Sequence, residues 1–279
     1  MEEDKIFAGS KPNFTYSKSH MNFTAIYTIW EREIIRYWRD KARIISTIIQ
    51  PLTFLVIFGT GLRQTLATGT LGIDFLKFMY PGIIAMNVMG VAFFSTISTV
   101  WDREFGFLKE ILVAPVSRTS IALGKALGAT TVASGQALLL LILAPFLGIT
   151  LHFILIPKLI FFMILLAFSI SGLGLLISSL LKSLESFGLI MQILIFPMFF
   201  LSGAFFPLTA VPNWMKALAS INPLTYGVDS LREIILSDQI TSGEAMKIIL
   251  HSQPVNAFFL LAFSALMILA AVVAFNKKN

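Results

Sequence analysis

Six long apolar stretches do most to limit what this chain can fold into. They cover about residues 44–62, 79–100, 120–147, 158–181, 186–206 and 255–275. Each supplies the roughly 20 apolar residues that a helix needs to cross the hydrocarbon core of a membrane. Backbone polar groups cannot be left unbonded in that core, so stretches of this length are expected to be helices. We predict an all-α membrane protein with six transmembrane helices.

The composition agrees with a membrane protein. Of the 279 residues, 56% are hydrophobic and 13% are charged, whereas soluble domains carry about 25% charged residues. The chain contains no cysteine, which excludes disulfide and thiolate chemistry but does not decide the compartment. Residues 1–20 show no periodicity. We expect them to be a disordered or loosely attached extension before one membrane domain at 21–279.

The distribution of lysine and arginine indicates the orientation. If the N-terminus is cytoplasmic, the inner segments hold 15 of these residues and the outer segments hold 6. Cytoplasmic segments of membrane proteins carry the excess of positive charge. We therefore expect both termini, and the segment after the second stretch, to be cytoplasmic.

An amphipathic helix is predicted at 23–43, before the first stretch. Its apolar positions recur at helical spacing: Phe23, Ile26, Tyr27, Trp30, Ile34 and Trp38. Its other face carries Glu31, Arg32, Arg36, Arg39 and Arg43. A helix with an aromatic and a basic face lies in the headgroup plane of a membrane. The residues that we assign to this interfacial role are Trp30, Arg32, Arg36 and Trp38; the alternative is a solvated cap that only orients the first span.

The sequence offers no catalytic, metal or cofactor constellation. The interiors of the apolar stretches hold no Asp, Glu, Lys or Arg, and Lys125 lies near the inner end of the third. Ion-coupled transporters usually carry ionisable residues at membrane depth. The three histidines lie in separate segments, and no G-x-x-x-x-G-K-[ST] phosphate loop is present. We expect no enzyme site, no cofactor and no nucleic-acid partner for this chain.

Polar and aromatic residues at membrane depth are the candidates for a solute path. Asn87, Gln136 and Gln192 lie among small residues. Small residues let helices pack closely and polar side chains bond across helices, so helix packing is one interpretation and a solute path is the other. Phe199 and Phe200 lie near the outer end of the fifth stretch, among further phenylalanines. They would form an apolar gate, or pack in the core or against lipid.

A short charged segment, WDREFGFLKEILVAPVSR at 101–118, separates the second and third stretches. Residues 104–113 can form a helix with one apolar and one charged face. Apolar anchors within a charged rim are typical of a helix that docks on a partner protein. The predicted docking residues are Arg103, Glu104, Phe105, Gly106, Leu108, Lys109, Glu110 and Leu112. The alternative is an interfacial loop that only links two spans.

The segment 207–254 is expected to lie outside and to contain two short helices. Pro207 and Pro212 would end the fifth span, and Asn222-Pro223 is a plausible N-cap and first helical position. The apolar character of these short helices predicts that they are re-entrant and dip back towards the membrane.

Taken together, these features resemble the membrane subunit of an ABC-2 type exporter, and most of all the drug- and antibiotic-export permeases of the daunorubicin-resistance kind. The likeness rests on the six-span plan, on EFGFLKEILVAPVSR with the GKALG that follows it, and on FLSGAFFP…VPNWM…INPLTYGVDSLR. It covers about residues 21–275, and the extension at 1–20 departs from the pattern.

The resemblance implies a permease that takes its energy from a partner. Such a permease forms a homodimer or a pseudo-symmetric heterodimer in the inner membrane of a prokaryote. It binds two copies of a separate ABC ATPase, which hold ATP and Mg²⁺, through a cytoplasmic coupling helix. The expected activity is export of a hydrophobic or amphipathic, drug-like solute from the cytoplasm or the inner leaflet. The alternatives are export of a lipid-linked polysaccharide or lipo-oligosaccharide, and a non-transporting scaffold or sensor.

Overall fold

A computed structural model describes residues 21–61, 75–106, 116–149, 151–237 and 248–277 of the chain. In these ranges the chain forms helices joined by turns, with no β-strand. The α-helices are α1 (Phe23–Arg39), α2 (Lys41–Gly61), α4 (Phe75–Ser95), α5 (Ile97–Glu104), α7 (Arg118–Ile142), α8 (Ile156–Leu180), α9 (Leu184–Phe200), α10 (Asn213–Ile221), α11 (Pro223–Ile235) and α13 (Gln253–Lys277). Three short 3-10 helices lie at Ala144–Leu147, Phe153–Leu155 and Leu208–Ala210.

Within the described residues, four helical segments are long and apolar enough to cross a membrane. They are Phe75–Glu104, Arg118–Ile142, Phe153–Leu180 and Gln253–Phe275. They coincide with the second, third, fourth and sixth of the predicted spans. The remaining two predicted spans fall on α2, which has 21 residues and contains Pro51, and on α9, which is shorter at 17 residues.

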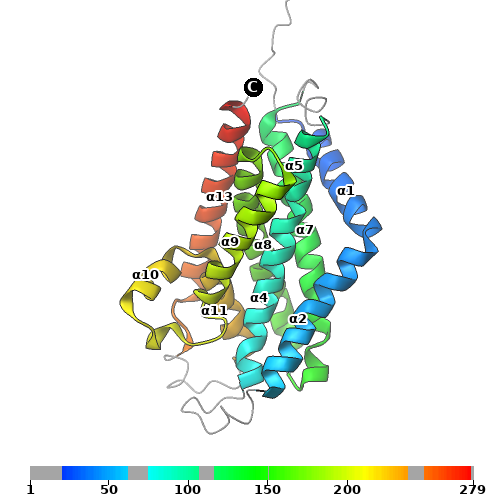
Figure 1. Ribbon diagram of the computed structural model, residues 1–279. Helices are drawn as coiled ribbons and strands as arrows, with labels where there is room; N and C mark the ends of the chain where they lie inside the picture. Colours follow the sequence, from blue (N-terminus) through cyan, green and yellow to red (C-terminus); the bar gives the residue numbers. More distant parts are fainter. Residues whose placement is uncertain (1–20, 62–74, 107–115, 150, 238–247, 278–279) are drawn as a thin grey trace, which may run out of the picture.

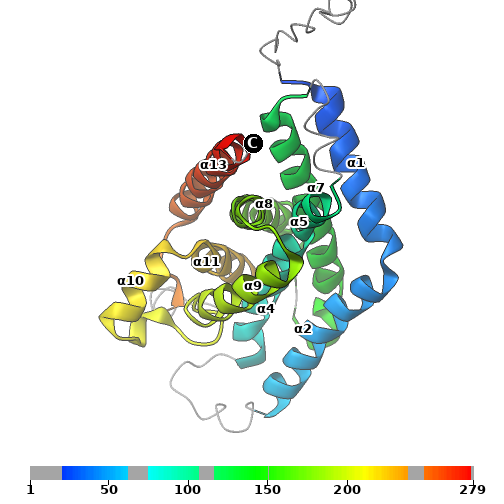
Figure 2. The ribbon, with the colours of Figure 1, turned by 45° about the horizontal axis from the view of Figure 1, so that its top comes forward.

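The long helices form one bundle around α8. Figure 2 shows α8 near the centre, with α4, α5, α7, α11 and α13 packed around it. α1 lies outside the bundle against α7, and α2 continues from it along α4 (Figure 1). Both ends of the described chain lie at one end of the bundle, close to the tip of α5 (Figure 1). α10 and α11 lie towards the opposite end.

The predicted helix at 23–43 is divided in two. α1 ends at Arg39, and Asp40 adopts a non-helical backbone with φ −88° and ψ 73°. The Asp40 carboxylate accepts a hydrogen bond from the Arg43 N–H at 3.1 Å and so caps the start of α2. The prediction of one helix across this point was wrong in that respect, because apolar periodicity does not reveal a capping aspartate inside a run. The resulting bend between α1 and α2 is called the elbow below.

The predicted second and fifth spans also have different ends. α4 stops at Ser95, and α5 carries the segment on to Glu104, four residues beyond the expected end. α9 stops at Phe200, six residues before the expected end at 206, and Gly203 follows with φ +77°. This left-handed backbone favours glycine and turns the chain before Pro207 is reached. The helix start at Asn222-Pro223 is confirmed, since the Asn222 side chain accepts a hydrogen bond from the Leu224 N–H.

α1 packs on α7 at two glycines one helical turn apart. A Cβ built on Gly124 would lie 2.8 Å from the Ile29 Cβ, and one on Gly128 would lie 2.7 Å from the Glu33 Cβ. Glycines at this spacing let two helix backbones approach closely. The small residues at 124–136 therefore seat α1 against the bundle.

Replacing Gly128 by alanine should loosen α1. The added methyl would meet the root of the Glu33 side chain, and overpacking of this kind costs about 1–3 kcal/mol. The free energy of unfolding in mild detergent should fall, and amide hydrogen exchange in α1 should speed up. Gly135→Ala is the matched control, because a Cβ there meets nothing within 4 Å and alanine favours the helix. Equal effects of the two changes would contradict the close packing of α1 on α7.

Candidate functional site

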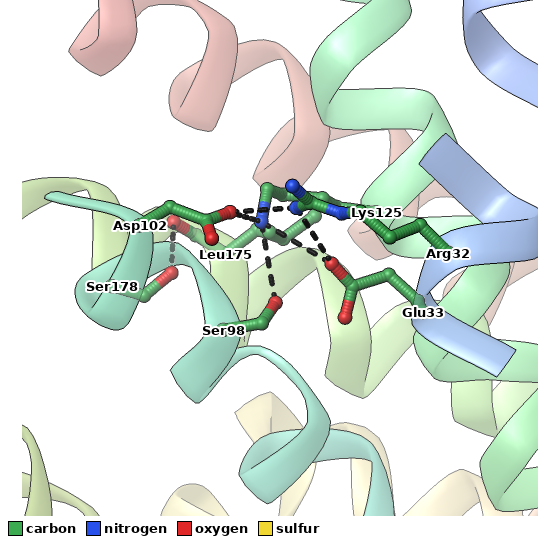
Figure 3. Close-up of polar contacts among 7 residues, drawn as sticks. All are labelled: Arg32, Glu33, Ser98, Asp102, Lys125, Leu175 and Ser178. Carbon is green, nitrogen blue, oxygen red and sulfur yellow. Dashed lines mark hydrogen bonds and ion pairs between the residues drawn. The ribbon is translucent and has the colours of Figure 1, made fainter. Parts of the chain in front are cut away.

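Four charged side chains meet where α1, α5 and α7 come together (Figure 3). The Lys125 Nζ atom of α7 lies 2.6 Å from Asp102 Oδ2 of α5 and 3.4 Å from Glu33 Oε1 of α1. The Arg32 Nη2 atom lies 2.7 Å from the same Asp102 oxygen and 3.3 Å from Glu33 Oε1. Lys125 also donates to Ser98 Oγ at 3.2 Å. We call these five residues the buried ion cluster.

Pairing makes the burial of these charges possible. Lys125 is 2% exposed, and Glu33 and Asp102 are 7% exposed each. A buried ion is costly unless it is paired and hydrogen-bonded. Burial alone would lower the pKa of Arg32, but Asp102 and Glu33 more than offset this and raise it, so the guanidinium stays charged. Two cations and two carboxylates leave the cluster neutral.

Local structure explains how the cluster is assembled. Ser98 and Asp102 are four residues apart on α5 and therefore share one face. Gly124 and Gly128 flank the Lys125 turn of α7 and let α1 come close enough to bring Glu33 into contact. The cluster joins the amphipathic helix α1 by direct bonds to α5 and to the N-terminal part of α7, which belong to two of the predicted spans. Movement of any one of the three helices would have to break ion pairs or carry the other two along.

Sequence reasoning missed most of this cluster. Of its members only Arg32 was a candidate, and it was placed on the side of the helix that faces the headgroups. The structure corrects that placement, because Arg32 turns towards the Asp102 carboxylate. A usable signal was present: Lys125 is a lone lysine in a stretch of small residues, and such a charge requires a carboxylate partner.

Arg103 and Glu104 at the tip of α5 bond to another part of the same chain. Arg103 Nη1 donates to the Leu181 carbonyl at 2.6 Å, and Glu104 Oε2 accepts from the Leu184 N–H at 3.1 Å. Both partners lie at the turn between α8 and α9. The tip of α5 is therefore tied to that turn as well as to α1 and α7.

Phe105, directly after α5, projects from this tip. Its side chain is 78% exposed, and the following Gly106 has φ +81°, a backbone that favours glycine. The other predicted docking residues, Leu108, Lys109, Glu110 and Leu112, lie outside the described residues. The predicted helix at 104–113 does not start as expected, because Glu104 is the last residue of α5 and the chain leaves the helical conformation at Phe105 and Gly106. The rest of that prediction lies outside the described residues.

Of the remaining predicted interfacial residues, Trp30 and Arg36 contact other helices of the protein, and Trp38 is exposed. Trp30 Nε1 donates to Thr131 Oγ1 of α7 at 3.0 Å, which fixes one aromatic ring against the bundle. The Arg36 guanidinium lies 4.3 Å from the ring centroid of Trp101. Trp38 is 73% exposed and is free to contact lipid or water.

Asn87 and Gln136 meet at one residue of α2. Asn87 Nδ2 donates to the Thr47 carbonyl at 2.8 Å, and Gln136 Nε2 donates to the Thr47 hydroxyl and to the Ile44 carbonyl. Both amides are buried. They join α4 and α7 to α2, which agrees with the helix-packing interpretation. Gln192 on α9 is exposed.

The predicted phenylalanines gather with a residue of α2. Phe199 and Phe205 are in edge-to-face contact at 4.5 Å between ring centroids, and Phe54 of α2 lies 6.3 Å from Phe199 and 5.4 Å from Phe205. Phe200 stacks on Phe205 at 5.4 Å. We call Phe54, Phe199, Phe200 and Phe205 the aromatic cluster. The contribution of α2 was not foreseen, because residues 54 and 199 are far apart in the sequence.

A second set of buried charges fixes α11 near the other end of the bundle. Arg232 is 3% exposed and donates to the carbonyls of Gly203 and Ala204 at 2.9 and 3.2 Å. Asp229 accepts from the N–H groups of Leu250 and His251, each at 2.9 Å. α11 is thereby anchored both to the exit of α9 and to the segment that leads into α13.

Comparisons with known proteins agree on one family. Residues 24–236 match the family model described as "ABC-2 type transporter". The chain is 31% identical over 210 residues to ycf38 of Cyanophora paradoxa, a transport permease by name, covering 74% of this chain and 72% of ycf38. It is 27% identical over 218 residues to the inner membrane transport permease YadH of Escherichia coli K12, covering 76% of this chain and 83% of YadH. It is 32% identical over 173 residues to YbhR of the same strain, a multidrug ABC transporter permease by name, covering 60% of this chain and 45% of YbhR.

The ion cluster should respond to substitution as a unit. Lys125→Met leaves Asp102 and Glu33 to share Arg32 and should lower the free energy of unfolding by about 3–5 kcal/mol. Adding Asp102→Asn removes the excess carboxylate, so the double variant should be more stable than the single variant. Denaturant unfolding in detergent measures both. If the two losses simply add, the charges do not depend on one another in the folded protein.

Proposed function

This chain belongs to the ABC-2 type transporter family, and we propose that it is the membrane subunit of an exporter driven by a separate ATPase. Two copies of the ATPase would hold ATP and Mg²⁺ and act on the tip of α5. The transported molecule would be a hydrophobic or amphipathic, drug-like solute taken from the cytoplasm or the inner leaflet. The name of YbhR supports the drug-like solute, and the aromatic cluster offers a surface of matching chemistry.

The observation that carries this proposal is the bonding of the tip of α5. The exposed Phe105 follows directly on a helix whose Asp102 is paired with Lys125 and Arg32. An ATPase that engages Phe105 and its neighbours would therefore push α1, α5 and α7 together. The bonds of Arg103 and Glu104 would pass the same movement to the turn between α8 and α9.

The proposed placement has both termini in the cytoplasm of a prokaryote and six spans in its inner membrane, with α2 and α9 completing the set. Two observations support it. The charge distribution puts 15 of the 21 lysines and arginines in the inner segments. The two ends of the described chain and the tip of α5 share one end of the bundle (Figure 1).

α10 and α11 are proposed to form the re-entrant segment on the outer side. α10 exposes Trp214 at 62%, Leu218 at 43% and Ile221 at 66% on one face, and Lys216 and Ser220 on another. Such a helix suits the boundary between hydrocarbon and water. α11 is buried along most of its length and would close the outer end beside the aromatic cluster.

We propose a dimer of this chain, either with itself or with a paralogue, in which the solute path lies between the two copies. Exposed apolar side chains on α2 and α9 support it. Ile49 and Ile57 of α2 are 55% and 59% exposed, and Ile193 and Phe196 of α9 are 73% and 58% exposed. In the dimer these side chains would face the partner or lipid, and the aromatic cluster would act as an apolar gate.

Two single-cysteine variants test the orientation. The natural chain has no cysteine, and Lys182 and Lys216 are both exposed, at the turn between α8 and α9 and on α10. An impermeant thiol reagent should label Lys216→Cys in intact cells, and it should label Lys182→Cys only after the cells are opened. Labelling of Lys182→Cys alone in intact cells would reverse the proposed orientation.

Phe105→Ala tests the coupling contact. The side chain has little contact with the rest of the described chain, so the free energy of unfolding should change by less than about 0.5 kcal/mol. Loss of a buried aromatic anchor at an interface costs about 2 kcal/mol or more, which weakens ATPase binding roughly thirtyfold. The amount of ATPase that co-purifies with the permease measures the loss of binding, and export from cells measures the loss of coupling.

Phe146→Ala is the matched control for that experiment. Phe146 is 83% exposed and follows the far end of α7, away from the tip of α5. It should keep both ATPase binding and export. If Phe105→Ala retains its ATPase and exports like the unmodified protein, the contact lies elsewhere. If no ATPase accompanies even the unmodified protein, the proposed function itself fails.

A further inference from the structure

A cavity of about 270 Å³ lies inside the elbow between α1 and α2. Its walls come from both sides of the elbow and from the faces of α5 and α7 opposite. Three arginines line it: Arg36 and Arg39 from α1, and Arg43 from α2. We propose that this cavity binds the phosphate group of an anionic phospholipid of the cytoplasmic leaflet.

The charge balance of the cavity favours an anion. Glu33 and Asp40 also line it, but Glu33 is already paired with Lys125 and Arg32 inside the neutral ion cluster. Asp40 then stands alone against three arginines. None of the three forms an ion pair within the part of the chain that the structure describes. Arginine is well suited to phosphate because its planar fork can donate two parallel hydrogen bonds to phosphate oxygens.

Two of the three arginines, Arg36 and Arg43, are also held in place. Arg36 stacks on Trp101, Arg43 Nη2 donates to Ser95 Oγ at 3.3 Å, and Arg43 lies 5.5 Å from the ring centroid of Tyr37. Side chains that are already oriented lose less conformational entropy when the site binds its ligand. Ser95 and Ser98 line the opposite wall, and their hydroxyls add polar groups with which a lipid headgroup could form hydrogen bonds.

Position and size select a lipid rather than a large solute. On the proposed membrane placement, from which this inference starts, the elbow lies where the basic helix α1 gives way to the apolar α2. Ile45 and Ile49 at the start of α2 are 57% and 55% exposed, as suits a segment that borders acyl chains. About 270 Å³ is small for a drug-sized molecule, whose pockets typically measure about 300–1,000 Å³, but it has room for a phosphate diester.

A bound lipid would bear directly on the coupling site. Glu33 and Ser98 belong both to the cavity wall and to the buried ion cluster. Trp101 precedes Asp102 on α5. A lipid bound in the cavity would thus stabilise the packing of the elbow against α5, the helix that the ATPase is proposed to move. Anionic lipid would thereby favour the conformation in which the buried ion cluster is intact.

Binding of a short-chain lipid to the full chain tests the inference. The purified protein in neutral detergent is titrated with dihexanoyl phosphatidylglycerol, with dihexanoyl phosphatidylcholine and with inorganic phosphate, and its thermal midpoint is followed. We expect a saturable rise with phosphatidylglycerol alone. An equal response to phosphatidylcholine would overturn the selectivity for an anion, and an equal response to inorganic phosphate would overturn the lipid as the ligand.

Substitution of the arginines locates the site. Arg36→Gln/Arg39→Gln should weaken phosphatidylglycerol binding by more than tenfold, since each basic residue near an anionic lipid contributes about fivefold. Arg36→Lys/Arg39→Lys should recover part of it by restoring the charge. Lys182→Gln/Lys216→Gln removes two exposed cations elsewhere and should bind normally. Arg39→Gln alone, at an exposed position, serves if the double variant folds poorly, and should show about fivefold weakening.

Co-purification of the ATPase with the same proteins separates this inference from the proposed function. Unchanged phosphatidylglycerol binding in the arginine variants overturns the lipid site, even where the ATPase still co-purifies. Lost lipid binding with a retained ATPase supports the site. Absence of the ATPase from the unmodified protein counts against the proposed function and leaves the lipid titration to be judged by itself.

Discussion

The buried charge of Lys125 is the constraint on which the α5 end of this structure depends. An ammonium that is 2% exposed must have carboxylates at hand, and they come from two other helices. Asp102 reaches it only if α5 continues past the end of α4, and Glu33 reaches it only if α1 lies flat on α7. The glycines at 124 and 128 remove the side chains that would hold α1 away. Close packing and charge pairing therefore require each other here.

The same arrangement ties several helices together at the tip of α5. α5 is only eight residues long, yet it bonds to α1, α7 and the turn between α8 and α9. The end of α5, where the exposed Phe105 follows, is consequently the place from which a movement would be shared among the most helices. At the other end of the bundle, Arg232 and Asp229 hold α11 in place. They bind it to the turn after α9 and to the segment before α13. The aromatic cluster lies on the α9 side of that anchor, so the helix segments that carry it are held in place by the same contacts.

Much of the fold could be read from the sequence, because it follows from local patterns. The long apolar stretches, the amphipathic N-terminal helix and the Asn222-Pro223 helix start depend on residues that are neighbours along the chain. The boundaries were less predictable. Asp40 divides one expected helix into two, and Gly203 ends α9 early, since a capping side chain or a left-handed turn overrides the hydrophobic pattern that surrounds it.

The site divides along the same line. By itself the sequence determined that the chain is built for a membrane, which segment between its predicted spans is charged, and the family that it resembles. Only the tertiary structure decided that Arg32 faces Asp102, that Arg103 and Glu104 bond to the turn before α9, that Asn87 and Gln136 meet at Thr47, and that three arginines line one cavity. The physical reason is that a buried charge or amide requires a partner, but the local sequence does not specify which residue on which helix that partner is. The identity of the partner depends on which helices pack together. Lys125 and Glu33, for example, are 92 residues apart in the sequence.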